Sequence, residues 1–223
     1  MTATEMIYTI TTWAIPLLLS IIVHEVAHGY VALWLGDYTA KDAKRLTLNP
    51  WAHVDIVGTI FLPILLFISK APFLIGWAKP VPVTYGNLNN PNRDMGLVAL
   101  AGPVSNVLLA VVFVLIGKLT VNFFEYGSPS SNWVMENVHN GVVFSLVLAA
   151  FNLIPILPLD GGRILLSLLP IRYAIKYQRF EPYGMFILLG LIFVPSLVGI
   201  NLVGWFLGTL FPYLYKFVML ITS

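Results

Sequence analysis

The chain has 223 residues, of which 58% are hydrophobic and 10% are charged, and it contains no cysteine. Soluble domains carry about a quarter charged residues, so the polar groups of this chain cannot cover a water-facing surface, and a soluble globular protein is excluded. The formal net charge of +2 gives no support to a nucleic-acid partner, and the lack of cysteine excludes disulfides and thiolate metal ligands.

The apolar residues gather in segments long enough to be membrane helices. A helix that spans the lipid bilayer needs roughly 20 mostly apolar residues. The stretch 56–69 is shorter and contains Pro63, which favours a short or re-entrant segment. The last apolar stretch is interrupted by Pro195, Gly199 and Asn201 and therefore predicts two helices. We expect one all-α membrane domain over 1–223 with five to six transmembrane helices, and the candidate segments are 8–35, 95–117, 139–159 and 183–220.

The loops differ in charge, and this difference predicts the orientation. Lys and Arg collect after the first helix, before the second and after the third, whereas 121–138 contains Glu125 and Glu136 but no Lys or Arg. Because cytoplasmic loops carry the excess of Lys and Arg, we expect 121–138 and the N-terminus to lie outside. The segment 54–92 then leaves and returns on the cytoplasmic side. The small size suggests a prokaryotic cell membrane as the location.

The sequence HEVAH at the end of the first apolar segment places His24, Glu25 and His28 inside a predicted membrane helix. Residues four apart lie on one face of a helix, so the two histidines can bind one metal ion. Glu25 can then act as the general base, as in the H-E-x-x-H pattern of zinc metalloproteases. Polar residues that only pack between helices are the alternative, but ionisable groups are costly in the bilayer. We therefore expect a metal site nearer the cytoplasmic end of this helix.

A third metal ligand has to come from elsewhere, and Asp160 is the candidate. An apolar helix is interrupted by Asn152, Pro155 and Pro158 shortly before Asp160. Irregular backbone at membrane depth is tolerated where it lines a wet cavity or is buried in protein, so this break predicts a cavity that contains Asp160. The alternative is that Asp160 caps the helix that follows. A cap does not account for Asn152 and the two prolines.

Three motifs together resemble the site-2 proteases, which are zinc-dependent intramembrane proteases. These motifs are HEVAH, AGPVSN at 101–106 and NLIPILPLDG at 152–161, and they lie in a predicted catalytic core of about 8–169. The resemblance implies one Zn²⁺ per chain and, as substrates, transmembrane segments of membrane proteins. It also implies a compact type without PDZ or CBS domains. The implied zinc ligands are His24, His28 and Asp160, the implied base is Glu25, and Asn152 is implied to contact the substrate backbone or the oxyanion.

Two further segments have implied roles near the site. In GWAKPVPVTYGN at 76–87, Val81 and Val83 alternate with prolines, and an exposed edge of this kind can bind an extended peptide. The resemblance suggests a re-entrant β-hairpin here, and a rigid polyproline-like loop is the alternative. Asn106 is expected to form hydrogen bonds between helices, and by resemblance it also lines the substrate cavity. His53 is expected to form local hydrogen bonds, with a gate or an extra metal ligand as the alternative.

Two other functions are compatible with these motifs. A metal transporter would use the histidines and Asp160 to pass an ion, but transport favours ionisable residues along the whole pathway, and here they converge at one depth. A catalytically silent relative would only bind membrane proteins, and Glu25 argues against this because a binder does not need a base. The sequence therefore predicts a zinc endopeptidase of the membrane.

Overall fold

The computed structural model describes residues 2–61, 65, 68, 78–125 and 127–223, and in these residues the chain is helical without strands. In this described part of the chain, seven helices have at least eight residues, and short helical turns lie between them. The long helices are α1 (Ala3–Trp34), α4 (Pro91–Phe123), α5 (Pro129–Asn152), α6 (Asp160–Leu168), α7 (Ile171–Gln178), α8 (Gly184–Ser196) and α9 (Leu202–Thr222). The short ones are α2 (Thr39–Asp42), η1 (Pro50–His53), η2 (Ile56–Phe61), η3 (Tyr85–Asn87) and η4 (Glu181–Tyr183).

Four of these helices, α1, α4, α5 and α9, are long and apolar enough to cross a membrane, so the chain is a multi-pass membrane protein. They have 32, 33, 24 and 21 residues, respectively. The C-terminal segment forms two helices as predicted, but α8 has only 13 residues. At 1.5 Å per residue α8 is about 20 Å long, which is shorter than the bilayer core of about 30 Å. The described residues therefore contain four candidate spans instead of the predicted five to six.

The structure extends the predicted helices at their polar ends. Thr2 and Glu5 form a capping box at the start of α1. Ser128 caps α5, whose first residue is Pro129. Capped ends of this kind hold polar residues in a helix. The region 121–138 was predicted as an outer loop, but most of it is therefore helical, and the non-helical part between α4 and α5 is short.

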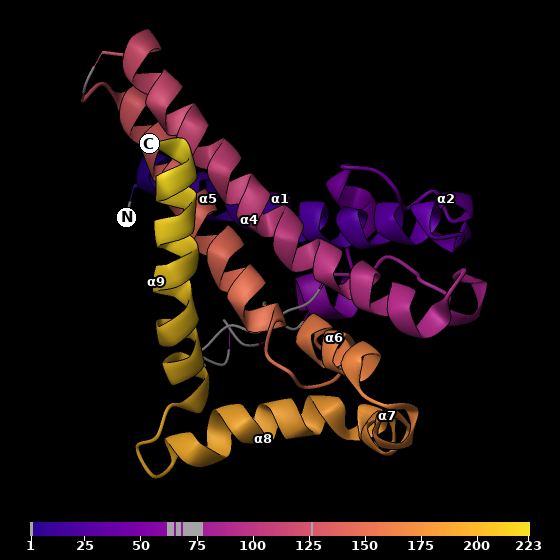
Figure 1. Ribbon diagram of the computed structural model, residues 1–223. Helices are drawn as coiled ribbons and strands as arrows, with labels where there is room; N and C mark the ends of the chain where they lie inside the picture. Colours follow the sequence, from indigo (N-terminus) through magenta and orange to yellow (C-terminus); the bar gives the residue numbers. More distant parts are fainter. Residues whose placement is uncertain (1, 62–64, 66–67, 69–77, 126) are drawn as a thin grey trace.

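The spans pack into a bundle in which α4 lies against α1, α5, α6 and α9 (Figure 1). Small polar side chains join α1 to α5: Ser20 Oγ lies 2.9 Å from Ser145 Oγ, and Asn140 donates a hydrogen bond of 2.8 Å to the Thr12 carbonyl oxygen. Such bonds hold membrane helices together where no hydrophobic force acts between them. The buried apolar core lies between α4, α5 and α9 and consists of Ala110, Phe113, Val138, Val142, Leu146 and Val218.

The predicted break in the third span is present. Helix α5 ends at Asn152, a turn follows, and α6 begins at Asp160. Helix α6 folds back closely onto this turn, because a Cβ atom on Gly161 would lie 2.4 Å from the carbonyl oxygens of Leu153 and Ile154. A residue with a side chain does not fit at this position. The two glycines after Asp160 therefore allow the carboxylate to return toward the bundle.

Residues 78–84, termed the proline loop, lack regular secondary structure and run beside the C-terminal half of α1, from the contact of Val81 with Glu25 to that of Thr84 with Asp37. They contain no strand, and Tyr85–Asn87 form η3, so the predicted β-hairpin is not seen within 78–87. Residues 76–77 of the predicted hairpin segment lie outside the described residues. Buried Asp37, 0% exposed, holds this loop. Its carboxylate accepts hydrogen bonds from the backbone N–H groups of Thr84, at 2.6 Å, and Thr39, at 3.0 Å. Asn87 donates a third bond at 3.2 Å.

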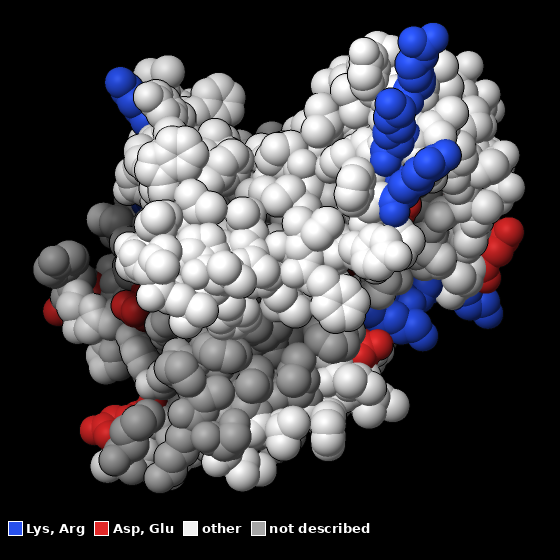
Figure 2. Space-filling view, turned by 90° about the horizontal axis from the view of Figure 1, so that it is seen from below, with Lys and Arg blue, Asp and Glu red and all other residues white. Residues whose placement is uncertain are grey.

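The outer surface suits a lipid environment. Large apolar side chains such as Trp34, Leu108, Phe123 and Trp205 are exposed. Figure 2 shows the molecule from below, where most visible Lys and Arg side chains gather at the end that holds α2 and α7. Much of the remaining described surface in this view carries no charge. This separation of charge marks one end of the bundle as basic.

Candidate metal centre

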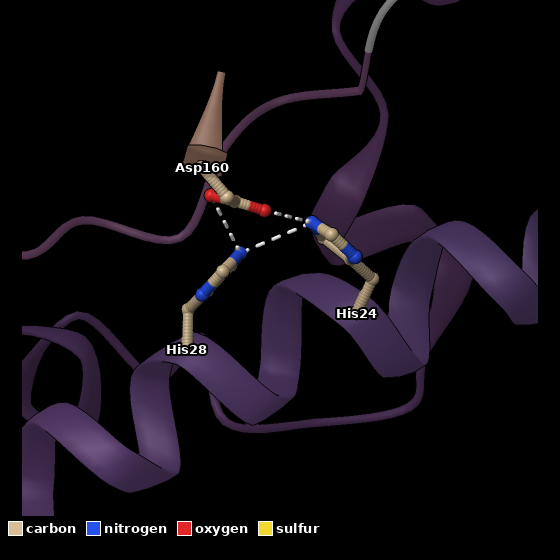
Figure 3. A group of neighbouring side chains, drawn as sticks. All are labelled: His24, His28 and Asp160. Carbon is tan, nitrogen blue, oxygen red and sulfur yellow. Dashed lines mark hydrogen bonds and ion pairs between the residues drawn. The ribbon is translucent and has the colours of Figure 1, made fainter. Parts of the chain in front are cut away.

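Two side chains from α1 and one from α6 meet inside the bundle (Figure 3). His24 Nε2 lies 3.1 Å from Asp160 Oδ2, and His28 Nε2 lies 3.4 Å from Asp160 Oδ1. The two Nε2 atoms are 3.1 Å apart. These are the three residues predicted to bind the metal ion. They form the group of His and acidic residues, within the part of the chain that the structure describes, whose atoms lie close enough to share an ion.

The spacing of these atoms fits a zinc ion. With bonds of about 2.0–2.1 Å in tetrahedral geometry, neighbouring ligand atoms are separated by about 3.3 Å. The two Nε2 atoms are 3.1 Å apart, and each lies 3.1–3.4 Å from one of the two carboxylate oxygens of Asp160, so the three side chains are as close together as zinc ligands are. In addition, the buried Oδ2 atom of Asp160 meets no hydrogen-bond geometry with the described residues, and its near neighbour is the Nε2 atom of His24 at 3.1 Å. A buried carboxylate oxygen needs a partner, and a cation between the three side chains supplies one.

Asp160 faces the histidines and does not cap its own helix. Leu159 occupies the N-cap position of α6, and no side chain makes a capping hydrogen bond there. Asp160 is the first helical residue and is 9% exposed. The position of its carboxylate next to two imidazoles favours the role of metal ligand over the capping alternative.

Helix α4 lies directly behind the histidine rings. A Cβ atom on Gly102 would lie 2.5 Å from both His24 Cε1 and His28 Nε2, so the close approach of α4 requires glycine there. The Val98 carbonyl oxygen lies 2.6 Å from His28 Nδ1. Asn106 is fully buried, and its amide lies 3.1 Å from His24 Nδ1. Asn106 therefore contacts a histidine ring and is not among the residues that line the cavity.

Glu25 is held by the proline loop. Its Oε2 atom accepts a hydrogen bond of 2.7 Å from the backbone N–H of Val81. Pro80 and Pro82 have no N–H groups, so Val81 is the donor that this part of the loop can offer to Glu25. The Val81 side chain is 7% exposed and packs toward Gly29 of α1. Glu25 is thus oriented by the loop next to the group of His24, His28 and Asp160.

A cavity of about 470 Å³ opens onto these residues. It is large enough for several water molecules at about 30 Å³ each. Asn152 lines it and donates a hydrogen bond of 3.0 Å to the Leu148 carbonyl oxygen. Val81 and Val83 line the same cavity. Arg163 also lines it and lies 3.4 Å from Glu181.

His53 lies outside the metal group. Its Nε2 atom is 2.8 Å from the Thr47 carbonyl oxygen, which is the local hydrogen bonding that the sequence suggested.

Three features of the site were not predicted from the sequence: the position of Gly102 against the rings, the contact of Val81 with Glu25, and the hydrogen-bond centre at Asp37. The sign of the hydrogen-bond centre at Asp37 in the sequence was the Gly36-Asp37 pair after the first helix. Gly36 lies at the end of α1 and has a positive φ of 102°.

The chain was compared with known proteins. Residues 120–195 match the family model described as Peptidase family M50. The chain is 38% identical over 182 residues to the "Putative zinc metalloprotease YwhC" of Bacillus subtilis, with 81% of this chain and 80% of the relative covered. It is 28% identical to Rip2 of Mycolicibacterium smegmatis, with 85% of this chain and 70% of the relative covered. It is 29% identical to MJ0611 of Methanocaldococcus jannaschii, with 85% of this chain and 75% of the relative covered. Both relatives are also described as putative zinc metalloproteases. No solved structure matches.

These matches lead to the same type of protein as the candidate metal site does. The Bacillus relative is similar over four fifths of both chains. The matched region of the family model includes α6 with Asp160. The chain therefore belongs to peptidase family M50, the site-2 protease family of zinc metalloproteases.

Proposed function

We propose that the protein is an intramembrane endopeptidase that uses one zinc ion per chain to cleave transmembrane segments of other membrane proteins. The observation that carries this proposal is the depth of the candidate metal centre. His28 and His24 precede the end of α1 at Trp34 by six and ten residues, which corresponds to about 9 and 15 Å along the helix axis. We place the exposed Trp34 at the membrane interface, where Trp is typically found. With a bilayer core about 30 Å thick, a substrate is then reached within the membrane.

His24, His28 and Asp160 are the proposed ligands of this zinc ion. Zinc bound there supplies the chemistry of a Lewis acid, polarising a carbonyl group and activating water for attack. The donor set fits, because two neutral imidazoles and one carboxylate are ligands that catalytic zinc commonly takes. The close spacing of the three side chains supports this assignment.

Glu25 is the proposed general base. It follows His24 on α1 and lines the same cavity. It takes a proton from the attacking water and later delivers it to the leaving amine. The Val81 N–H group orients the carboxylate, since a bond of 2.7 Å to a charged acceptor is short and directional.

Asn152 is proposed to contact the reacting peptide. An Asn amide has two N–H donors, and the Leu148 carbonyl oxygen takes one of them. The second donor can stabilise negative charge on the substrate carbonyl oxygen. Val81 and Val83 are proposed to contact the substrate chain through the cavity that they line.

We further propose that the metal centre lies nearer the cytoplasmic face and that the N-terminus lies outside. The end of the bundle that holds α2 and α7 carries most of the exposed Lys and Arg side chains visible in Figure 2. The turn between α4 and α5 at the other end contains Glu125 and no Lys or Arg. The positive-inside rule then assigns the basic end to the cytoplasm. In this arrangement 54–92 begins and ends on the cytoplasmic side as a re-entrant segment.

The test compares Glu25→Gln with the wild type and with Glu136→Gln, which changes an exposed Glu of α5 by the same chemistry. Each chain is expressed in cells, and new peptide ends in the membrane proteins are identified by mass spectrometry. We expect ends within transmembrane segments for the wild type and Glu136→Gln, and none for Glu25→Gln. Zinc content should be equal in all three, because Glu25 is not a ligand.

Two outcomes would contradict the proposal. If Glu25→Gln produces the same new ends as the wild type, Glu25 is not the base. If the new ends lie only in water-exposed loops, the protein is a metalloprotease that does not cleave within the membrane. A metal transporter would instead retain its zinc flux in Glu25→Gln, since transport does not require a base.

A further inference from the structure

Three positions of α4 face the two histidines with the same spacing as the histidines themselves. Val98, Gly102 and Asn106 are four residues apart and therefore lie along one face of the helix. The Val98 carbonyl group contacts His28, Gly102 lies against both rings, and the Asn106 amide contacts His24. This face of α4 thus contacts each imidazole at its Nδ1 atom, through Val98 and Asn106, and lies against both rings at Gly102.

The contact with Val98 determines which nitrogen of His28 carries the proton. A carbonyl oxygen can only accept a hydrogen bond, so His28 Nδ1 donates across the 2.6 Å separation. The Nε2 atom then keeps a free lone pair and points toward Asp160. Histidines that bind metals almost always donate their other N–H group in this way. The backbone therefore prepares His28 as a ligand.

His24 requires the same proton arrangement but has a side chain as its partner. If the Asn106 amide nitrogen, 3.1 Å away, donates to His24 Nδ1, then Nε2 carries the proton and cannot bind a metal ion. A half-turn of the amide group about χ2 exchanges its nitrogen and oxygen. The Asn106 oxygen, which is buried and accepts no hydrogen bond from the described residues, then accepts one from Nδ1–H.

We propose that Asn106 is a positioning residue that holds His24 with its proton on Nδ1 and its Nε2 lone pair toward the zinc ion. This inference rests on the proposed zinc site and assigns Asn106 to ligand orientation in place of substrate contact. Asn106 is fully buried, so a substrate cannot reach it. The alternative is an ordinary hydrogen bond between α1 and α4 that stabilises packing only.

Measuring zinc affinity distinguishes these two roles. The purified chain, its Asn106→Leu variant and its Asn106→Asp variant are titrated at one fixed pH against a chromogenic zinc chelator. Asn140→Leu is the matched control, because Asn140 makes a buried hydrogen bond between helices, to the Thr12 carbonyl oxygen, without touching a ligand. Thermal unfolding of the zinc-free proteins measures the effect on packing separately.

We expect Asn106→Leu to bind zinc about 10–100-fold more weakly, the usual effect of losing the partner of a metal-binding histidine. Asn106→Asp keeps an oxygen that accepts from Nδ1–H, so its affinity should equal or exceed that of the wild type. Asn140→Leu should lower the unfolding temperature while its zinc affinity stays unchanged. The visible spectrum of the cobalt-substituted protein should change in Asn106→Leu only.

Zinc affinity equal to that of the wild type in Asn106→Leu would overturn the inference. An equally large loss in Asn106→Asp would also overturn it, because Asn106 would then act as a donor. Where Asn106→Leu does not fold, Asn106→Ala makes the same comparison with less apolar bulk. Failure of the underlying site looks different: the wild type would bind no zinc, or Asp160→Ala would bind it as well as the wild type does.

Discussion

The strongest test of the metal centre is to add a single methyl group behind it with Gly102→Ala. A Cβ atom at this position would lie 2.5 Å from His24 Cε1, 2.5 Å from His28 Nε2 and 2.6 Å from His24 Nε2. Non-bonded carbon atoms prefer about 3.5–4.0 Å, so the rings or α4 have to move by about 1 Å. Zinc–ligand distances tolerate only about ±0.2 Å, and we therefore expect zinc affinity to fall by at least about tenfold.

The assay is equilibrium dialysis of the purified variant against buffered zinc, followed by measurement of zinc per chain. Gly208→Ala in α9 is the matched control, since a Cβ atom there meets nothing within 4 Å. Alanine favours helix over glycine by about 1 kcal/mol, so both variants should keep wild-type helicity by circular dichroism. Wild-type zinc affinity in Gly102→Ala would refute the placement of α4 against the two imidazoles.

Three further predictions concern the surroundings of the site. Val81→Pro removes the N–H group that holds Glu25 and should slow cleavage about 10–150-fold, from about 1.5–3 kcal/mol for a hydrogen bond to a charged group, with zinc content unchanged. Val81→Ala keeps this N–H group and should slow cleavage less than Val81→Pro does. Burial raises the pKa of Asp37, but hydrogen bonds from Thr39 and Thr84 outweigh it and keep the pKa below its ordinary value; thermal unfolding should therefore show stability lost as pH falls below about 4, and less so in Asp37→Asn. Zinc removal by a chelator should abolish cleavage and speed hydrogen exchange at the start of α6, and unchanged exchange there would argue against Asp160 as a ligand.

Local patterns predicted the parts of the site that lie on one element. The four-residue spacing of His24 and His28 determines their common face on any helix, and this spacing is visible in the sequence. The break before Asp160 was equally local, because prolines and glycines limit the backbone wherever they occur. The two C-terminal helices were predicted for the same reason, from Gly199, which has a positive φ of 77°, and from Asn201, which caps α9.

The missed features depend on contacts between elements. Whether Gly102 lies against an imidazole is decided by the packing of α4 on α1, and many glycines in membrane helices serve packing alone. The contact between Val81 and Glu25 uses a backbone N–H group, which every residue except proline has. The identity of the residue at position 81 therefore says little about whether this contact forms. The substrate role expected for Asn106 came from the motif as a whole. Its place one turn beyond Gly102 on the face toward α1 required the structure.

The break in the third span explains how a bundle of apolar helices can hold a metal site. If α5 continued as a helix beyond Asn152, residue 160 would lie about 12 Å further along the same axis, past the level of the histidines on the neighbouring helix. The turn and the close return at Gly161 bring Asp160 back beside His24 instead. The same turn leaves Asn152 at the edge of the cavity that contains Asp160. One local interruption thus brings together the proposed third ligand, the proposed substrate contact at Asn152 and a cavity with space for water.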